Sequence, residues 1–186
     1  MTTTIETTRL RLRRLAASDL SDLIRLDRDP EVMRYVGSPA GVRPPAETEE
    51  RARTRIRESE EGTHAPLGFW RVEGRGDGLF YGLAALIRMP AGEDVELAYR
   101  LARAAWGQGV ATEAGRALVG HALGALGLPR LVAVTYPDNL ASQRVLDKLG
   151  FERRGFLEYK GVQTTYHVLP RERWARDIDF NRAGPP

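Results

Sequence analysis

The feature that most constrains the fold is a change of hydrophobic period in the middle of the chain. Residues 95–101 alternate between apolar and polar side chains, which predicts a strand. A glycine-containing segment follows, and residues 110–126 then repeat apolar side chains at helical spacing as far as Gly127. Residues 131–136 form a short apolar run typical of a buried strand. A strand, a helix and a strand in this order predict a βαβ crossover with a parallel strand pair.

Further strands and helices are expected on both sides of this unit. The sequence predicts strands over residues 9–13, 67–72, 79–89, 151 onward and 164–169. It predicts helices over residues 20–26, with Ser18 as N-cap, and over 31–36, 46–61, 139–149 and 170–177, with a Gly- and Pro-rich loop at 37–45. We therefore expect a mixed α/β protein that forms one domain over residues 1–180, with a flexible tail at 181–186.

The composition limits the kinds of site that the chain can hold. Its 186 residues suffice for one domain with a sizeable core. It has no cysteine, which excludes disulfides, cysteine-ligated metals and a cysteine nucleophile. Its three histidines lie far apart without metal-ligand spacing, so no metal site is expected. The sequence shows neither a membrane-spanning apolar run nor a secretory signal, so we expect a cytoplasmic protein with no membrane partner.

The charge balance is slightly basic. Lys and Arg number 28 and Asp and Glu number 25, for a net charge of +3, and Lys148 and Lys160 are the two lysines in an otherwise arginine-based set. No sequence pattern of a nucleic-acid-binding fold accompanies this excess, so no nucleic-acid partner is expected. The excess is compatible with an anionic ligand.

The segment from Trp106 to Glu113 joins the predicted strand to the predicted helix. Gly107 and Gly109 permit a sharp turn, and the first N–H groups of the helix then face a place where a pyrophosphate can bind. The segment is not a P-loop, because no Lys-Ser or Lys-Thr follows Gly109, and it lacks the third glycine of a Rossmann motif at Thr112. Taken alone, it also fits a tight turn without a ligand.

A second element begins at Asn139-Leu-Ala-Ser142 and ends at Leu149-Gly-Phe151. Alone it is ordinary for a capped helix that ends in glycine. Together, the two elements resemble the GNAT superfamily of acyl-CoA N-acyltransferases, whose pattern is Q/R-x-x-G-x-G/A followed by N-x-x-[AS] and L-G-F. Trp106 stands in place of the usual Gln or Arg.

Within that superfamily the chain looks most like the ribosomal-protein N-terminal acetyltransferase subgroup. The segment from Trp106 to Ala114 is similar to the W-G-x-G-x-A-T-E-A pattern of that subgroup. Residues 7–12 and 29–35 are similar to its opening strand and its D-P-E-V segment. The resemblance covers roughly residues 7–174, which is nearly the whole chain.

The resemblance implies a GNAT fold with a mixed sheet of six to seven strands, splayed at the cofactor-binding strand, and acetyl-CoA as co-substrate. By the same resemblance, the strand backbone would hold the pantetheine arm, the glycine segment the pyrophosphate, and the Asn a pantetheine amide. The cofactor-binding positions are then Tyr99, Arg100, Leu101, Gly107, Gln108, Gly109, Val110, Ala111, Thr112, Asn139 and Ser142.

The catalytic base is expected to be Glu96, where the family often carries an acidic residue. A purely solvated role for Glu96 is the alternative, and Glu113 and Glu158 are the other candidates. The family's tyrosine acid is replaced by Leu146, so Ser142 is the hydroxyl that remains to assist the departing thiolate. Two other departures are Val134, where some relatives have Glu, and Ala98, where relatives usually have Gly.

With no cysteine available for an acyl-enzyme, acetyl transfer to the amine is expected to be direct. A weakly activated base suits an α-amine, with a pKa near 8, better than a lysine near 10.4, which favours a protein N-terminus as acceptor. A small-molecule amine such as an antibiotic or polyamine, and a non-catalytic acyl-CoA-binding module, are the alternatives. A monomer and a homodimer are equally compatible with the sequence.

Overall fold

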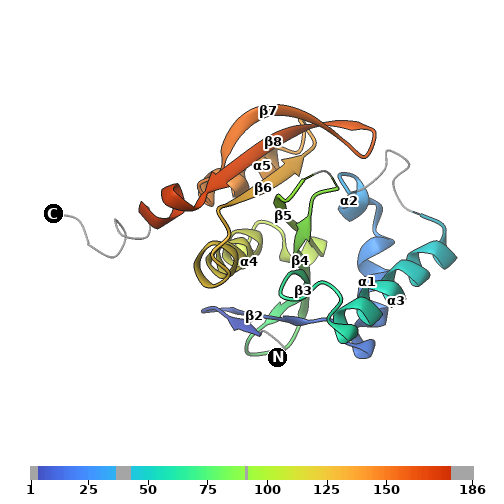
Figure 1. Cartoon of the computed structure of the whole chain (residues 1–186). Coiled ribbons are helices and arrows are strands. Elements are labelled where there is room, and N and C mark those ends of the chain that lie inside the picture. Colours follow the sequence, from blue (N-terminus) through green and yellow to red (C-terminus); the bar gives the residue numbers. More distant parts are fainter. Residues whose placement is uncertain (1–3, 37–42, 91, 177–186) are drawn as a thin grey trace.

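The computed structural model describes residues 4–36, 43–90 and 92–176. Within these ranges the framework is one mixed sheet of eight strands, in the order β1-β2-β3-β4-β5-β6-β8-β7 (Figure 1). The strands are β1 (Ile5–Glu6), β2 (Leu10–Arg14), β3 (Gly68–Gly74), β4 (Phe80–Arg88), β5 (Val95–Leu101), β6 (Arg130–Thr135), β7 (Glu152–Tyr159) and β8 (Val162–Pro170).

The sheet has more strands than the six to seven expected. The additional strand is the short β1, whose Ile5 pairs opposite Leu12 of β2. All neighbouring strands run antiparallel except β5 and β6, which are parallel. This confirms the βαβ crossover predicted from the change of hydrophobic period.

Helices cover both faces of the sheet (Figure 1). The labelled helices are η1 (Ala17–Asp19), α1 (Leu20–Asp27), α2 (Pro30–Met33), α3 (Pro45–Glu61), η2 (Arg103–Ala105), α4 (Val110–Val119), η3 (Gly120–Ala125) and α5 (Leu140–Lys148). Residues 171–176 are also helical, within the helix predicted over 170–177. One buried cluster, which includes Trp70, Leu97 and Leu118, joins α4 to the sheet. A second cluster, which includes Leu23 and Leu83, joins α1 and α3 to the opposite face. None of the helices in the described ranges is long and apolar enough to span a bilayer.

Two helix predictions need correction. Ser18 is not an N-cap: it lies inside η1, and α1 begins after Asp19. The Asp19 carboxylate accepts from the Ala16 N–H at 2.9 Å and pairs with Arg13 at 2.8 Å. The helix predicted over residues 110–126 is α-helical only to Val119 and continues as a π-helix.

The predicted tail at 181–186, and residues 37–42 of the predicted loop, lie outside the described residues.

The strands β5 and β6 diverge immediately after they meet. β5 pairs with β4 over its full length, whereas its parallel register with β6 consists of Glu96 opposite Val132. Among the described strands, the outer main-chain edge of residues 98–101 therefore has no neighbour. This is the splay that was expected at this strand.

Candidate active site

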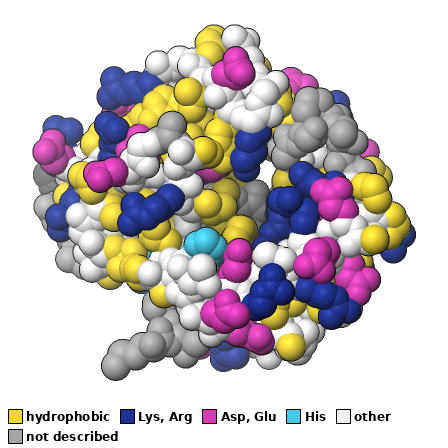
Figure 2. Space-filling model, turned by 45° about the vertical axis from the view of Figure 1, so that its right-hand side comes forward, with side chains coloured by type: hydrophobic (Ala, Val, Ile, Leu, Met, Phe, Trp, Pro, Cys, Tyr) yellow, Lys and Arg dark blue, Asp and Glu magenta, His cyan; other side chains and the backbone are white. Residues whose placement is uncertain are grey.

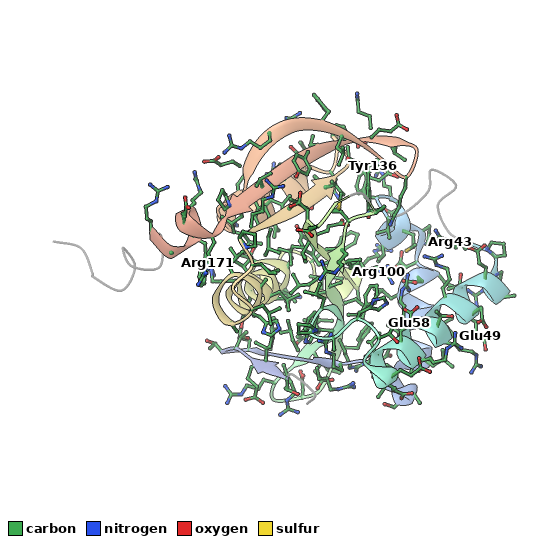
Figure 3. All side chains as sticks on the ribbon, in the orientation of Figure 1. Arg43, Glu49, Glu58, Arg100, Tyr136 and Arg171 are labelled. Atoms are coloured by element: carbon green, nitrogen blue, oxygen red, sulfur yellow. The ribbon has the colours of Figure 1, made fainter. Side chains whose placement is uncertain are left out.

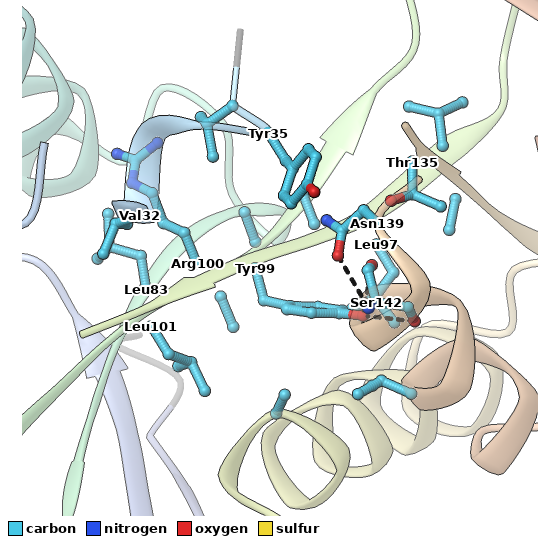
Figure 4. Close-up of a pocket in the computed structure, with 18 of the residues that line it drawn as sticks. Val32, Tyr35, Leu83, Leu97, Tyr99, Arg100, Leu101, Thr135, Asn139 and Ser142 are labelled. Atoms are coloured by element: carbon cyan, nitrogen blue, oxygen red, sulfur yellow. Dashed lines mark hydrogen bonds between the residues drawn. The ribbon is translucent and has the colours of Figure 1, made fainter. Parts of the chain in front are cut away.

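A cleft of about 1260 Å³ opens where β5 and β6 diverge. Its walls come from α2, α3, β4, β5, the segment before α4, β6, the start of α5 and the β7–β8 turn. Figure 2 shows the hollow in this face of the molecule, and Figure 4 shows part of its lining. Its volume exceeds the roughly 300–1,000 Å³ of drug-sized pockets, which leaves room for two substrates.

The cleft brings together nearly all of the predicted site residues. Glu96, Tyr99–Leu101, Gly107, Gly109–Thr112, Asn139 and Ser142 all line it. Gln108 does not, because its side-chain amide turns back to donate to the Ala104 carbonyl. The prediction that Gln108 belongs to the cofactor site therefore finds no support from its side chain.

The glycine segment forms a turn that exposes main-chain N–H groups. Gly107 and Gly109 have φ values of 72° and 77°, in the left-handed region that L side chains rarely adopt. Gly109 is the N-cap of α4, and the Glu113 N–H donates to its carbonyl at 3.0 Å. The N–H groups of residues 110–112 precede that first helical bond, so they have no intrahelical acceptor. They form a site suited to a phosphate.

Trp106 fixes this turn to the end of β5. Its indole N–H donates to the Leu101 carbonyl at 2.8 Å, while about half of the side chain is exposed. The tryptophan that replaces the usual Gln or Arg of the resemblance therefore has a structural role. It holds the anion-binding turn against the strand that lines the cleft.

Glu96 is buried, although the strand pattern placed it on a polar face. Its side chain projects from β5, and its Oε2 accepts from the Tyr159 hydroxyl at 2.9 Å. Burial raises the pKa of Glu96, and this effect is only partly opposed by the hydrogen bond from Tyr159 and the charge of Lys160. A carboxylate with a raised pKa in a cleft has the properties of a general base.

The hydroxyl of Tyr99 meets Ser142 across the cleft. Its oxygen lies 3.0 Å from Ser142 Oγ and 3.3 Å from the Ser142 carbonyl oxygen (Figure 4). Burial raises the pKa of Tyr99 to about 12 despite the hydrogen bond with Ser142, so the phenol keeps its proton at neutral pH. From the sequence, Tyr99 was expected to bind the cofactor through its main chain, and no role was expected for its side chain. Its side chain places a phenol hydroxyl beside Ser142, whereas Leu146 is buried and carries no hydroxyl.

Asn139 caps α5 and also faces the cleft. Its Oδ1 accepts from the Ser142 N–H at 3.1 Å, which satisfies one of the free donors of the first turn. Because the oxygen is used in the cap, the amide N–H₂ group is the part that can donate to a ligand. Figure 4 shows this nitrogen on the side of Asn139 that faces Tyr35.

The alternative carboxylates lie outside the cleft lining. Glu113 accepts from the Thr7 hydroxyl at 2.6 Å and from the Arg9 main-chain N–H at 2.9 Å. Burial would raise the pKa of Glu113, but these bonds and the charge of Arg9 outweigh it and lower the pKa. Glu113 therefore anchors the start of the chain. Glu158 is exposed on β7.

The histidines are also absent from the lining of the cleft. His167 is buried with Thr165 Oγ1 at 3.0 Å, and burial lowers its pKa. His121 packs edge-on against Trp70. Among the described residues, no three His, Asp or Glu side chains gather in a way that could hold a metal ion.

An ion-pair group on the α1–α3 side of β5 was not anticipated from the sequence. Arg100 Nε lies 2.9 Å from Asp27 Oδ1, and Arg55 Nη1 lies 2.7 Å from Asp27 Oδ2. The alternation of β5 placed the Arg100 side chain on the same face as Glu96, but the partners on α1 and α3 are distant in sequence. Both arginines line the cleft.

The comparisons with known proteins agree with this geometry. The model of the Acetyltransferase (GNAT) domain family matches residues 9–152. YoaA, an uncharacterized N-acetyltransferase of Bacillus subtilis (strain 168), is 31% identical over 160 residues, which cover 82% of this chain and 85% of that protein. The FsC-acetyl coenzyme A-N(2)-transacetylase of Aspergillus fumigatus is 33% identical over 156 residues, which cover 79% of this chain and 64% of that protein.

Solved structures share the fold. A GNAT-family acetyltransferase from Bacillus anthracis aligns with a TM-score of 0.77 at 20% identity, covering 91% of this chain and 99% of that one. RimL, a ribosomal L7/L12 α-N-protein acetyltransferase solved in complex with coenzyme A, aligns with a TM-score of 0.73 at 20% identity, covering 90% and 98%.

The fold, the open β5 edge and the family match define the class of protein: the chain belongs to the GNAT acetyltransferase family. It is an N-acetyltransferase, and its family uses acetyl-CoA as the acyl donor.

Proposed function

We propose that this enzyme transfers an acetyl group directly from acetyl-CoA to a primary amine, and that an α-amine is its acceptor. The observation that carries the proposal is the convergence of three features in one cleft. These are the free N–H groups that begin α4, the open edge of β5, and the buried carboxylate of Glu96.

The residues of the cleft suit acetyl-CoA. The N–H groups of residues 110–112 would hold the pyrophosphate, and the open main-chain edge of residues 98–101 would pair with the amides of pantetheine. Asn139 has a free amide donor beside the same edge. When bound, the co-substrate supplies an acetyl thioester whose carbonyl carbon is the electrophile.

Glu96 is the proposed base. Its carboxylate, directly or through a water molecule, accepts a proton from the amine as the nitrogen attacks the thioester carbonyl. Tyr159 holds that carboxylate in place through its 2.9 Å hydrogen bond. The antiparallel β7–β8 hairpin carries Tyr159 and therefore helps to position the base.

Two groups remain to stabilise charge that develops on the donor. A main-chain N–H on the open edge of β5 would stabilise the negative charge on the carbonyl oxygen. The protonated hydroxyl of Tyr99, supported by Ser142, would donate to the departing sulfur. A thiolate is a fair leaving group, so we expect the second contribution to be smaller than the first.

The acceptor class rests on the chemistry of the base. An α-amine has a pKa near 8 and is partly neutral at pH 7, so it needs less help than a lysine side chain. The fold shared with RimL is compatible with a protein N-terminus as acceptor. The relationship to the FsC-acetyl coenzyme A-N(2)-transacetylase keeps a small amine as the second candidate.

The test is release of free thiol from acetyl-CoA in the presence of peptides with free N-termini, matched peptides with blocked N-termini and one lysine, and small amines. We expect the free N-terminal peptides to stimulate release and to gain one acetyl group by mass spectrometry. Stimulation by the blocked lysine peptides alone would contradict an α-amine acceptor, and the absence of any stimulation would contradict the proposed activity.

A further inference from the structure

The cleft concentrates positive charge. Among its lining residues, eight are Arg or Lys and four are Glu, whereas the whole sequence has 28 Lys and Arg against 25 Asp and Glu. Figure 2 shows Lys and Arg side chains beside the hollow. The nearly balanced charge of the chain is therefore distributed unevenly, with a cationic surplus in the cleft.

The most buried of these cationic side chains surround Asp27. This carboxylate is shared by Arg100, at 2.9 Å, and Arg55, at 2.7 Å, and all three side chains are at most 11% exposed. One carboxylate cannot neutralise two guanidinium groups. A net positive charge is therefore left in a largely desolvated place, and burial together with the charge of Arg55 lowers the pKa of Arg100 to about 9.

Two more arginines, Arg51 on α3 and Arg43 just before this helix, extend the group. Arg51 is exposed and lies one helical turn before Arg55; its partial desolvation together with the charges of Arg43 and Arg55 lowers the pKa of Arg51. Arg43 has an ion pair with Glu47 at 2.8 Å, but no acidic side chain among the described residues lies within ion-pair distance of Arg51. Figure 3 labels Arg43 at the start of α3 and Arg100 on β5.

The remaining acids of the cleft do not remove the surplus. Among the described residues, none of the four lining glutamates lies within ion-pair distance of Arg51, Arg55 or Arg100; the four are Glu31, Glu50, Glu58 and Glu96. Glu96 lies four residues before Arg100 on β5, a separation of about 13 Å along a strand. The cleft is thus bipolar, with a carboxylate at the position proposed for the amine and arginines farther along the same face.

We propose that the acceptor is an amine that also carries a carboxylate, and that Arg51, Arg55 and Arg100 bind that carboxylate while Glu96 receives the amine. This inference rests on the proposed function and specifies its substrate class. Guanidinium groups bind carboxylates through paired N–H donors, so an acceptor of this kind would supply the missing negative charge. The spacing along β5 favours a carboxylate several bonds from the amine, as in an acidic side chain at or near the residue that carries the α-amine, in a peptide or in a small amino-acid derivative.

The experiment compares acceptors that differ only in one carboxylate. The peptide pair is Ser-Ala-Glu-Ala-amide and Ser-Ala-Gln-Ala-amide, and the small-molecule pair is glutamic acid α-amide and glutamine α-amide, so that every acceptor carries an α-amine. We expect kcat/KM to be at least 10-fold higher for the carboxylate member of one pair, and the pair that shows the preference identifies the source of the carboxylate. Calorimetric binding of the same pairs in the presence of CoA measures the preference independently of turnover.

Arg51 provides the test variant, because it is exposed and has no ion pair whose loss would unfold the protein. We expect Arg51→Gln to reduce the carboxylate preference at least fivefold through the KM of the acceptor, with the KM of acetyl-CoA within twofold of the wild-type value. The matched control is Arg53→Gln, since Arg53 lies on the same helix, pairs with Glu49 and does not line the cleft. The control variant should behave as the wild-type protein does.

Each other outcome has a definite meaning. Equal kcat/KM and equal affinity for acid and amide members would overturn this inference and leave the acetyltransferase activity intact. An increase in the KM of acetyl-CoA in Arg51→Gln, with the acceptor preference unchanged, would show that the arginines serve the phosphates of the acyl donor and would also overturn it. Tighter binding of the acid members without any acetylation would contradict the proposed function while supporting the carboxylate site.

Discussion

Tyr99 of β5 and Ser142 of α5 are joined by a hydroxyl–hydroxyl contact of 3.0 Å. The contact links the strand that lines the cleft to the first turn of the helix after the crossover, where Asn139 is the cap. Because Leu146 occupies the place of the family's tyrosine, the sequence indicated Ser142 as the remaining hydroxyl. The structure adds Tyr99, a phenol from a different element, to the same spot.

Replacing Tyr99 by Phe tests which hydroxyl assists the leaving group. We expect Tyr99→Phe to lower kcat by about 10- to 100-fold, below the upper range for acid–base catalysis because a thiolate leaves readily. The ring still packs, so the KM of acetyl-CoA should change by less than about threefold. Steady-state kinetics at pH 7.5 measures both values. A larger loss of kcat in Ser142→Ala than in Tyr99→Phe would assign the role to Ser142.

Replacing Glu96 by Gln tests the base. We expect kcat/KM to fall by about 10²- to 10⁴-fold, the usual contribution of a positioned general base. Burial raises the pKa of Glu96, so the wild-type pH profile should rise on a limb above the ordinary glutamate value of about 4.3, and the variant should lack that limb. A second rise near pH 8, from the acceptor amine, should persist. Wild-type rates in Glu96→Gln would exclude Glu96 as the base.

Tyr159 offers a companion measurement. Its hydroxyl donates to the Glu96 carboxylate and so favours the charged form. We expect Tyr159→Phe to move the acidic limb of the profile to higher pH and to retain more activity than Glu96→Gln. An unchanged limb would mean that Tyr159 does not act through Glu96.

Glu96 should also reduce stability at neutral pH. The folded protein binds the Glu96 proton more tightly than the unfolded chain does, because the folded pKa is the higher one. The free energy of unfolding therefore falls as the pH rises from the unfolded pKa through the folded one. We expect Glu96→Gln to unfold at the same temperature as wild type, or at a higher one, at pH 7. A Tm lower by more than about 3 °C, which corresponds to about 1 kcal/mol in a protein of this size, would contradict this expectation.

The local parts of the site were predictable from the sequence. Gly107 and Gly109 were predictable because a sharp turn before a helix requires a conformation that favours glycine. Asn139 was predictable because an N-cap position favours a side chain with an oxygen acceptor. These features depend on neighbours within a few residues. The parallel β5–β6 pair was also predictable, because the change of hydrophobic period predicts a strand, a helix and a strand in order.

The contacts between elements were not predictable in the same way. Tyr99 and Ser142 lie 43 residues apart, and Arg100 and Asp27 lie 73 residues apart. Strand alternation indicates which face a side chain occupies, but not which helix covers that face. The burial of Glu96 illustrates the point, because it comes from the packing of β7 and β8 rather than from the pattern of β5.

Glu113 is expected to have a structural role and not a catalytic one. We expect Glu113→Gln to destabilise the protein by about 1–2 kcal/mol, since hydrogen bonds to a charged group from Thr7 and Arg9 are weakened. Because the folded pKa of Glu113 is lowered, this stabilisation is present at neutral pH and is lost as the pH falls through that pKa. Chemical denaturation at pH 7 and pH 4 measures the difference, which should shrink at pH 4. A loss of kcat greater than about 10-fold in the folded variant would restore Glu113 as a candidate base.

Asn139 allows its two roles to be separated by a pair of variants. Asn139→Asp keeps a side-chain oxygen that can accept from the Ser142 N–H, so the cap and the stability should be retained. The same change removes the amide donors that face the cleft, and we expect the KM of acetyl-CoA to rise at least fivefold. Asn139→Ala removes the cap as well, and it should lower the free energy of unfolding by about 0.5–2 kcal/mol in addition to raising the KM. Thermal unfolding and acetyl-CoA titration of both variants distinguish the roles, and an unchanged KM in Asn139→Asp would show that Asn139 serves the helix alone.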